Sequence, residues 1–315
     1  MLRGTGKIQE RFSQGDTSRL GRGGIVLSDS KCEGCQSQGS CNQDPATCSM
    51  PVPTRGGFKH IIAVGSGKGG VGKSSVSALL AIGLARLGNR VALLDADITG
   101  PSIPSMMGVS GMPKGTPEGI EPLASPSLGI RIISMNLFME DTSRPVVWRG
   151  PLIGNVISQF WNDTNWGDSE MLVIDLPPGT SDAPLTVMQT IALDGIVMVT
   201  TPQDLSTKIV EKMMHMTRMM NVPLVGVVEN MSHALCPHCG EKWEIFGPSH
   251  TGEICSRWDI PVLASLPIDR NMSLLSDAGR LEDYAGGNQP VEMAEKIMSA
   301  LGSLVTSPSE SPRRV

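Results

Sequence analysis

The sequence of 315 residues lacks the long apolar segments that mark membrane proteins. Its longest apolar run, around SALLAIGLARLG, is too short and too interrupted to span a bilayer. The first residues, MLRGTGKIQERF, lack the apolar centre of a secretory signal. Basic residues are not in excess either, because the net charge is −5. These absences favour a soluble, cytoplasmic protein without a membrane or nucleic-acid partner, although a local basic patch remains possible.

Aromatic residues are scarce at the start of the chain, where Gly, Ser, Gln and Asp are common. Such a segment cannot bury much surface, so residues 1–56 are expected to form a flexible, cysteine-rich arm that includes the linker PVPTRGG. A folded domain is expected over residues 57–303, because 40% of all residues are hydrophobic and can form a core. Residues 304–315, which include TSPSESPRRV, are predicted to be a disordered tail.

Short apolar runs alternate with helical patterns through the folded domain. The runs are predicted to be strands and lie at 61–65, 90–95, 131–135, 171–176, 195–201, 223–230 and 261–267. Continuous apolar runs of this length are typical of strands buried on both faces. After the first strand, Val76, Leu79, Leu80, Leu84 and Leu87 share one helical face, and Gly88 can cap that helix. The pattern predicts an α/β fold, a mostly parallel sheet flanked by helices on both faces, with ligands beyond the carboxyl ends of the strands.

The first strand runs into GSGKGGVGKSS, which matches the phosphate-binding motif G-x-x-x-x-G-K-S without a gap. Glycines let backbone N–H groups surround phosphates, and the start of the next helix adds its positive end. Lys73 is expected to neutralise phosphate oxygens, and Ser74 to bind Mg²⁺. An accidental glycine-rich turn is the alternative. The expected nucleotide contacts in this loop are Gly65, Ser66, Gly67, Lys68, Gly69, Gly70, Val71, Gly72, Lys73, Ser74 and Ser75.

The second lysine of this loop, Lys68, gives the deviant form KGGxGK[ST]. In this respect the loop resembles that of the SIMIBI-type ATPases, which include MinD, ParA and ArsA. The resemblance implies that Lys68 reaches the nucleotide of a partner subunit and acts there as an arginine finger does. The alternative is a solvated surface lysine.

Polar residues follow three later strands. LLDADITGPSIP places Asp97 to orient the attacking water and Asp95 to hold a Mg²⁺-bound water, unless both belong only to a turn. Asp175 in MLVIDLPPGTSD is expected to bind Mg²⁺ through water, and Asp182 to cap a helix near Ala183. Asn230 ends a strand where it can recognise adenine, with a turn-forming role as the alternative.

Seven cysteines form two groups, and an odd total argues against complete disulfide pairing. CPHCG contributes Cys236 and Cys239, which are half of a four-coordinate metal site. Four thiolates suit Zn²⁺ and an iron–sulfur cluster equally, and a surface redox pair is a third possibility. Cys255 lies in a helical pattern and is expected to be a buried small apolar residue.

The pattern ENMSHALCPHCGEKWEIFG, together with GSGKGGVGKSS, LLDADITGPSIP and VIDLPPGTSD, resembles the Mrp/ApbC family of iron–sulfur cluster carriers over roughly residues 57–290. The resemblance implies a homodimer in which Cys236 and Cys239 of each subunit hold one bridging [4Fe–4S] cluster. It also implies weak ATP hydrolysis coupled to delivery of the cluster to apo iron–sulfur proteins. The alternatives are a positioning or partition ATPase with a structural zinc site, and an electron-transferring reductase like the nitrogenase iron protein.

The cysteines of the arm resemble a second motif, the amino-terminal cluster motif of the eukaryotic cytosolic scaffold related to this family. The motif has another cysteine fourteen positions before Cys32, where this chain has Ser18. Cys48 can supply that thiolate instead. The arm is therefore expected to bind a second cluster or zinc, with unligated thiols as the alternative. The ligands would be Cys32, Cys35, Cys41 and Cys48.

Overall fold

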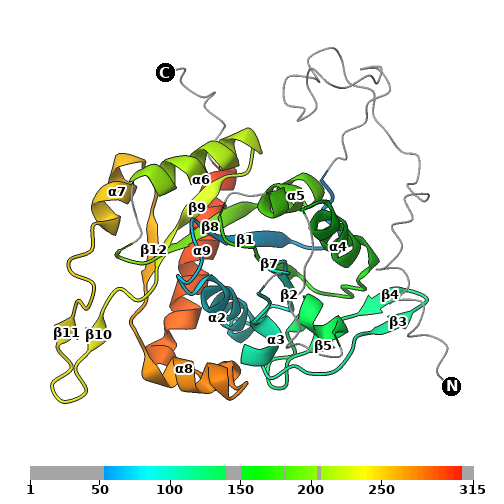
Figure 1. The fold of residues 1–315 in the computed structure, drawn as a ribbon, viewed down its shortest axis with the longest axis horizontal. Coiled ribbons are helices and arrows are strands. Elements are labelled where there is room, and N and C mark those ends of the chain that lie inside the picture. The colour runs from blue at the N-terminus through cyan, green and yellow to red at the C-terminus, as the bar shows by residue number, and fades with distance from the viewer. Residues whose placement is uncertain (1–52, 99, 140–149, 180–181, 204–206, 307–315) are drawn as a thin grey trace, which may run out of the picture. The chain divides into compact units, whose positions relative to one another are not determined.

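The computed structural model describes residues 53–98, 100–139, 150–179, 182–203 and 207–306 (Figure 1). The chain separates into two units, Met1–Pro53 and Thr54–Val315, and the fold described here is that of the second unit. The four cysteines of the predicted arm lie outside the described residues, so the prediction of a metal site there stays a prediction.

The second unit is built on an eight-stranded sheet with the order β12-β9-β8-β1-β7-β2-β6-β5. All neighbouring strands are parallel except β5 and β6, so the mostly parallel sheet expected from the sequence is confirmed. The strands are β1 (His60–Ser66), β2 (Val91–Asp95), β5 (Leu123–Ala124), β6 (Arg131–Ser134), β7 (Met171–Asp175), β8 (Gly195–Thr200), β9 (Leu224–Glu229) and β12 (Val262–Ser265).

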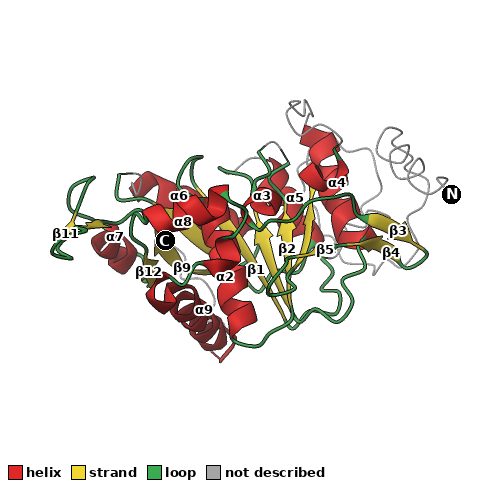
Figure 2. Cartoon of the chain, turned by 90° about the horizontal axis from the view of Figure 1, so that it is seen from below, coloured by secondary structure: helices red, strands yellow, loops and turns green. Residues whose placement is uncertain are grey.

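Helices cover both faces of the sheet, as Figures 1 and 2 show. On one face α2 packs against α9, and on the other α4 packs against α5. The α-helices are α2 (Lys73–Arg86), α3 (Ile103–Met106), α4 (Gly150–Asp163), α5 (Asp182–Thr190), α6 (Thr207–Met219), α7 (Thr251–Arg257), α8 (Arg270–Asp277) and α9 (Gln289–Thr306). Short 3₁₀ helices are η2 (Met135–Phe138), η3 (Leu281–Asp283) and η4 (Gly286–Asn288). None of the described helices is long and apolar enough to cross a membrane.

Two small antiparallel hairpins extend this core. One pairs β3 (Lys114–Thr116) with β4 (Gly119–Glu121), and the other pairs β10 (Ala234–Leu235) with β11 (Lys242–Trp243). The central strands β1, β2, β7 and β8 are buried almost throughout, because helices shield both of their faces.

Helix α2 differs from the expected amphipathic helix. It is buried on nearly every side, and Leu87, which was assigned to its buried face, lies beyond its last turn and is 40% exposed. The reason is that the helix ends at Arg86 and the chain turns at Gly88, whose φ of 87° suits glycine. Gly88 thus ends the helix as expected.

Both ends of the folded unit extend further than the sequence indicated. Arg55 forms a two-pronged ion pair with Asp194 at 2.7 Å, and Thr54 pairs with Ile191, so part of the expected linker belongs to the fold. At the other end α9 continues to Thr306, three residues into the predicted tail.

Candidate functional site

The strand order places three functional loops side by side at the carboxyl edge of the sheet. Strand β7 lies between β1 and β2, and Asp175 is in register with Val64 on one side and with Asp95 on the other. The loop that follows β1 therefore faces the residues that end β2 and β7. This edge is where ligands of parallel sheets bind.

The loop between β1 and α2 has the shape of a phosphate cradle. Gly70 and Gly72 have φ values of 83° and 79°, in the left-handed region that favours glycine. Gly72 is the residue before the first turn of α2, and no side chain caps that turn. The first N–H groups of α2 thus face the loop, and the helix dipole favours an anion there.

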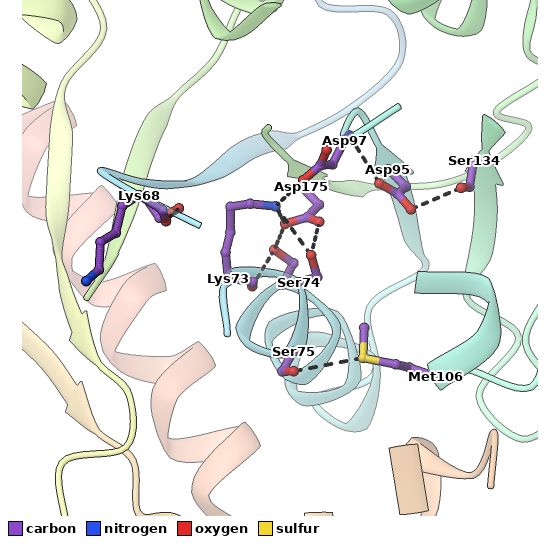
Figure 3. A network of polar contacts seen from close by, with 11 residues as sticks. Lys68, Lys73, Ser74, Ser75, Asp95, Asp97, Met106, Ser134 and Asp175 are labelled. Carbon is purple, nitrogen blue, oxygen red and sulfur yellow. Dashed lines mark hydrogen bonds and ion pairs between the residues drawn. The ribbon is translucent and has the colours of Figure 1, made fainter. Parts of the chain in front are cut away.

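Asp175 is the centre of a buried polar network below this loop (Figure 3). Its carboxylate is fully buried and accepts hydrogen bonds from Lys73 Nζ at 2.7 Å and from Ser74 Oγ at 2.6 Å. Ser77 Oγ donates a third hydrogen bond at 2.7 Å. Lys73 is only 6% exposed, and Asp97 lies 3.7 Å from its ammonium group.

A second buried carboxyl group, that of Asp95, adjoins this network. Asp95 accepts hydrogen bonds from Ser134 Oγ at 3.0 Å and from the backbone N–H of Asp97 at 3.2 Å. Burial, and then the charge of Asp175, raise the pKa of Asp95 to about 8. Burial also raises the pKa of Asp175, against the opposing effect of Lys73. Burial and mutual repulsion thus disfavour ionisation of both carboxyl groups, and a cation placed beside them would favour their charged forms.

The donor set fits Mg²⁺. The Ser74 hydroxyl and the Asp175 carboxylate are hard oxygen ligands that already lie within 2.6 Å of each other. Asp95 and Asp97 adjoin this pair, since Asp97 lies 3.7 Å from Lys73 and its backbone N–H donates to Asp95. A hydroxyl at the first turn of the helix and an aspartate at the end of the neighbouring strand are the pair that holds Mg²⁺ in P-loop NTPases.

The two lysines of the loop have different surroundings. Lys73 is inside the network, whereas Lys68 is exposed and Figure 3 shows its side chain directed away from Lys73 and Asp175. The Ser75 hydroxyl also points away from the network, toward the sulfur of Met106 at 3.9 Å. Lys68 therefore does not meet the phosphate site of its own subunit in this structure.

Asn230 contacts the phosphate loop, but its side chain is buried rather than exposed at the edge of the site. It is 2% exposed, and its side-chain N–H group donates a hydrogen bond to the carbonyl oxygen of Val71 at 3.0 Å. The predicted contact with adenine stays a prediction. Helix α5 begins at Asp182, one residue before the expected start near Ala183, and the capping role of the Asp182 side chain lies outside the described residues.

The CPHCG segment forms the turn of the β10–β11 hairpin, which Figure 1 shows projecting from the sheet and helices. The N–H of Cys236 donates to the carbonyl of Glu241, and the N–H of Gly240 donates to that of Cys236, each at 2.9 Å. Cys239 is exposed and Cys236 is half-buried. Hydrogen bonds from the backbone of Cys239 and His238, and from the Cys239 thiol, lower the pKa of the Cys236 thiol.

These two thiols form a pair rather than a complete site. Among the described residues, no three His, Cys, Asp or Glu side chains gather where they could hold a metal ion. Cys255 is 1% exposed in α7, and burial raises the pKa of its thiol to about 11, so the expected apolar role is consistent with its position.

Several polar residues of the site were not singled out from the sequence. Ser77 could have been found, because it lies four positions after Lys73 and so on the same helical face. Ser134 ends β6 and reaches Asp95 only because β6 lies beside β2. Glu229, which accepts hydrogen bonds from Ser249 and Thr251, depends in the same way on tertiary structure.

The parallel sheet, the glycine-rich loop between β1 and α2, and the buried network of Lys73, Ser74 and Asp175 together define a P-loop NTPase. Residues 57–302 match the family model described as ParA, NUBPL iron-transfer P-loop NTPase. The chain belongs to this family, which confirms the resemblance to the Mrp/ApbC cluster carriers.

Curated relatives agree with this assignment. The chain is 40% identical over 272 residues to the iron-sulfur cluster carrier protein of Clostridium perfringens, covering 82% of this chain and 95% of the relative. It is 41% identical to the protein of the same name from Aquifex aeolicus, covering 82% and 69%. A cytosolic Fe-S cluster assembly factor NUBP2 homolog from Dictyostelium discoideum is 42% identical, covering 70% and 86%.

Solved structures support the same fold. A nucleotide-binding protein from Archaeoglobus fulgidus, solved in complex with ADP and with cobalt, is 42% identical and superposes with a TM-score of 0.65, covering 72% of this chain and 89% of that one. The cell division protein MinD of Aquifex aeolicus is 17% identical, with a TM-score of 0.51 and coverage of 76% and 97%. At that identity the likeness to MinD concerns the fold alone.

Proposed function

We propose that the chain is an ATP-hydrolysing carrier that holds a [4Fe–4S] cluster between two subunits and transfers it to apo-proteins. The observation that carries this proposal is the Cys236–Cys239 pair, held in an exposed turn of a chain whose phosphate-loop residues Lys73 and Ser74 bond to Asp175. The names of the relatives from Clostridium and Aquifex, both iron-sulfur cluster carrier proteins, support it.

A two-fold axis would complete the metal site. One CPHCG turn supplies two thiolates, and a second copy of the chain placed symmetrically supplies two more. The lowered pKa of Cys236 favours the thiolate that metals bind. Because Cys239 is exposed, a cluster held this way would lie at the surface of each subunit, within reach of a partner protein.

At the nucleotide site, the N–H groups of the loop and Lys73 would bind the phosphates of ATP. Ser74 and Asp175 would hold Mg²⁺, which offsets the charge that develops on the phosphates. Asp97 lies at the edge of the network, where it could orient the attacking water. Lys68 would complete the site of the partner subunit, which links hydrolysis to formation of the dimer.

A cytosolic location is part of the same proposal. The Dictyostelium relative is described as cytosolic, which supports a cytosolic location for this chain. A second cluster or zinc ion on Cys32, Cys35, Cys41 and Cys48 is also proposed, on the basis of their spacing.

Anaerobic reconstitution with ferrous iron and sulfide tests the cargo. We expect labile sulfide in proportion to iron, and a loss of one cluster per two chains in the Cys236→Ala/Cys239→Ala variant. Cys255→Ala is the matched control, since this cysteine is buried and should keep the full content. The variant Cys32→Ala/Cys35→Ala distinguishes the iron and sulfide of a cluster on the arm from those of the cluster held by Cys236 and Cys239. Zinc without labile sulfide in the unaltered chain would contradict the proposal.

A further inference from the structure

The segment between β9 and α7 contains the cysteine hairpin, and its two ends meet at one place. The chain leaves the sheet after Glu229 and comes back beside this residue at Ser249 and Thr251, where α7 begins. Glu229 is 3% exposed, and one of its carboxylate oxygens accepts hydrogen bonds from the hydroxyl groups of both Ser249 and Thr251. This carboxylate therefore closes the base of the segment that presents Cys236.

Asn230 joins the same base to the phosphate loop. Its side-chain nitrogen donates to the carbonyl oxygen of Val71, and its backbone N–H donates to Thr200 at 2.7 Å. A Cβ atom added at Gly72 would lie 2.2 Å from that side-chain nitrogen. Since the contact is this close and buried, the loop cannot shift without moving the end of β9 or breaking the hydrogen bond.

The peptide unit between Val71 and Gly72 lies between Asn230 and the position of a bound phosphate. The C=O and N–H groups of a planar trans peptide point in opposite directions, and none of the described peptide bonds is cis. The Val71 carbonyl points to Asn230, so the Gly72 N–H points to the opposite side, away from Asn230. Backbone N–H groups in such a loop donate to phosphate oxygens. A bound phosphate and Asn230 therefore act on opposite ends of one rigid unit.

We propose that Asn230 and Glu229 are positioning residues that transmit occupancy of the phosphate loop to the cysteine hairpin. A phosphate that binds the Gly72 N–H fixes the peptide, Asn230 follows its carbonyl, and Glu229 moves the base of the hairpin through its two hydroxyl partners. Cys236 is six positions after Asn230 on this segment. The inference rests on the proposed nucleotide binding, and does not depend on what the cysteines hold.

The rate at which N-ethylmaleimide modifies Cys236 and Cys239 tests this linkage. The full chain is kept reduced and metal-free except for Mg²⁺, and peptide mass spectrometry separates these thiols from the others. In the unaltered chain, saturating Mg·ADP or a non-hydrolysed ATP analogue should shift the equilibrium between protected and reactive forms of the hairpin by about five-fold, the lower end of equilibrium coupling between sites, and the modification rate should change with it. An unchanged rate with bound nucleotide would overturn the proposal.

The decisive variant is Ser249→Ala/Thr251→Val, which removes both donors to Glu229 far along the chain from the phosphate loop. We expect unchanged nucleotide affinity and loss of the nucleotide-dependent change in rate. The matched control is Ser256→Ala, which removes an exposed hydroxyl group that donates to the carbonyl of Gly252 in its own helix and should keep the full response. The double variant could instead be modified faster both with and without nucleotide while the ratio of these two rates stays that of the unaltered chain. That result would show that the two hydroxyl groups have only a structural role, and it would refute the linkage.

Asn230→Ala, measured at saturating nucleotide, gives a second route to the same answer. It removes the bond to Val71, so the response should again be lost, and a retained response would contradict the inference. Failure of the chain to bind nucleotide would overturn both this inference and the proposed ATPase. Failure to assemble a cluster would overturn the proposed cargo alone and leave the linkage standing.

Discussion

Replacing Asp95 with asparagine should stabilise the nucleotide-free protein and reduce its turnover of ATP. Asp95 is fully buried beside Asp175, and these surroundings raise its pKa from 3.8 to about 8. The folded protein thus keeps a proton on Asp95 at neutral pH, whereas the unfolded chain releases it. Asparagine has nearly the same shape, needs no proton, and can keep hydrogen bonds to Ser134 and to the backbone of Asp97.

The size of the effect follows from this difference in proton binding. The folded state binds the extra proton between the two pKa values, so the free energy of unfolding falls as the pH rises from about 4 to about 8. Each pH unit in this window costs about 1.4 kcal/mol, so the step from pH 5 to pH 7 costs at most about 2.7 kcal/mol. At roughly 2–4 °C per kcal/mol, Asp95→Asn should raise Tm by several degrees at pH 7.

Urea-induced unfolding from pH 5 to pH 8, with EDTA and without nucleotide, measures this contribution. The unaltered chain should lose stability with rising pH more steeply than Asp95→Asn, and the two curves should diverge toward pH 8. Asp168→Asn is the control, because Asp168 is exposed and hydrogen bonds from Arg131 lower its pKa. Parallel curves for the unaltered chain and Asp95→Asn would refute the raised pKa and the reasoning built on it.

Three further predictions concern other parts of the fold. Lys68→Ala should bind ATP with unchanged affinity but lose most of its turnover, because a charge supplied in trans raises kcat by about 10³-fold or more in enzymes with an arginine finger. Unchanged turnover would exclude that role for Lys68. Gly83→Ala should lower the free energy of unfolding by about 2 kcal/mol or more, although alanine normally favours a helix, because its Cβ would lie 2.0 Å from the carbonyl of Pro290; urea unfolding checks this. Cys255 should resist iodoacetamide at pH 7.5 in the native protein while Cys236 reacts, because Cys255 is buried and the pKa of its thiol is about 11. Equal labelling of the two thiols in mass spectrometry would contradict this.

Much of the nucleotide site could be predicted because its parts follow strands directly. Lys73, Ser74 and Asp175 belong to short, dense patterns whose geometry is set by the turn after a buried strand. All seven predicted strands are present, since continuous apolar runs mark strands covered on both faces. The loop and the carboxylates meet because β7 lies between β1 and β2, an order that no local pattern states.

Other features depend on contacts between segments distant in sequence. Asn230 was assigned to the base of ATP because it ends a strand, but its contact with Val71 depends on how close β9 comes to the loop. Arg55 looked like part of a flexible linker, but it donates to the carbonyls of Phe58 and Lys59 and forms an ion pair with Asp194, 139 positions away. Ser249 accepts a local hydrogen bond from the backbone N–H of Thr251, but the contact of both hydroxyl groups with Glu229 depends on tertiary structure.

The network of Lys73, Ser74 and Asp175 also predicts how the site would discriminate between ATP alone and ATP with Mg²⁺. Lys73 and Ser74 both bond to Asp175, so bound phosphates must draw Lys73 away from a carboxylate that is fully buried. Removing one partner of a buried ion pair costs about 3–5 kcal/mol when nothing replaces it. ATP alone brings more negative charge and leaves Asp175 without a cation. ATP with Mg²⁺ restores a positive charge beside Asp175 and Ser74, so the binding of nucleotide and that of metal are expected to reinforce each other through this one carboxylate.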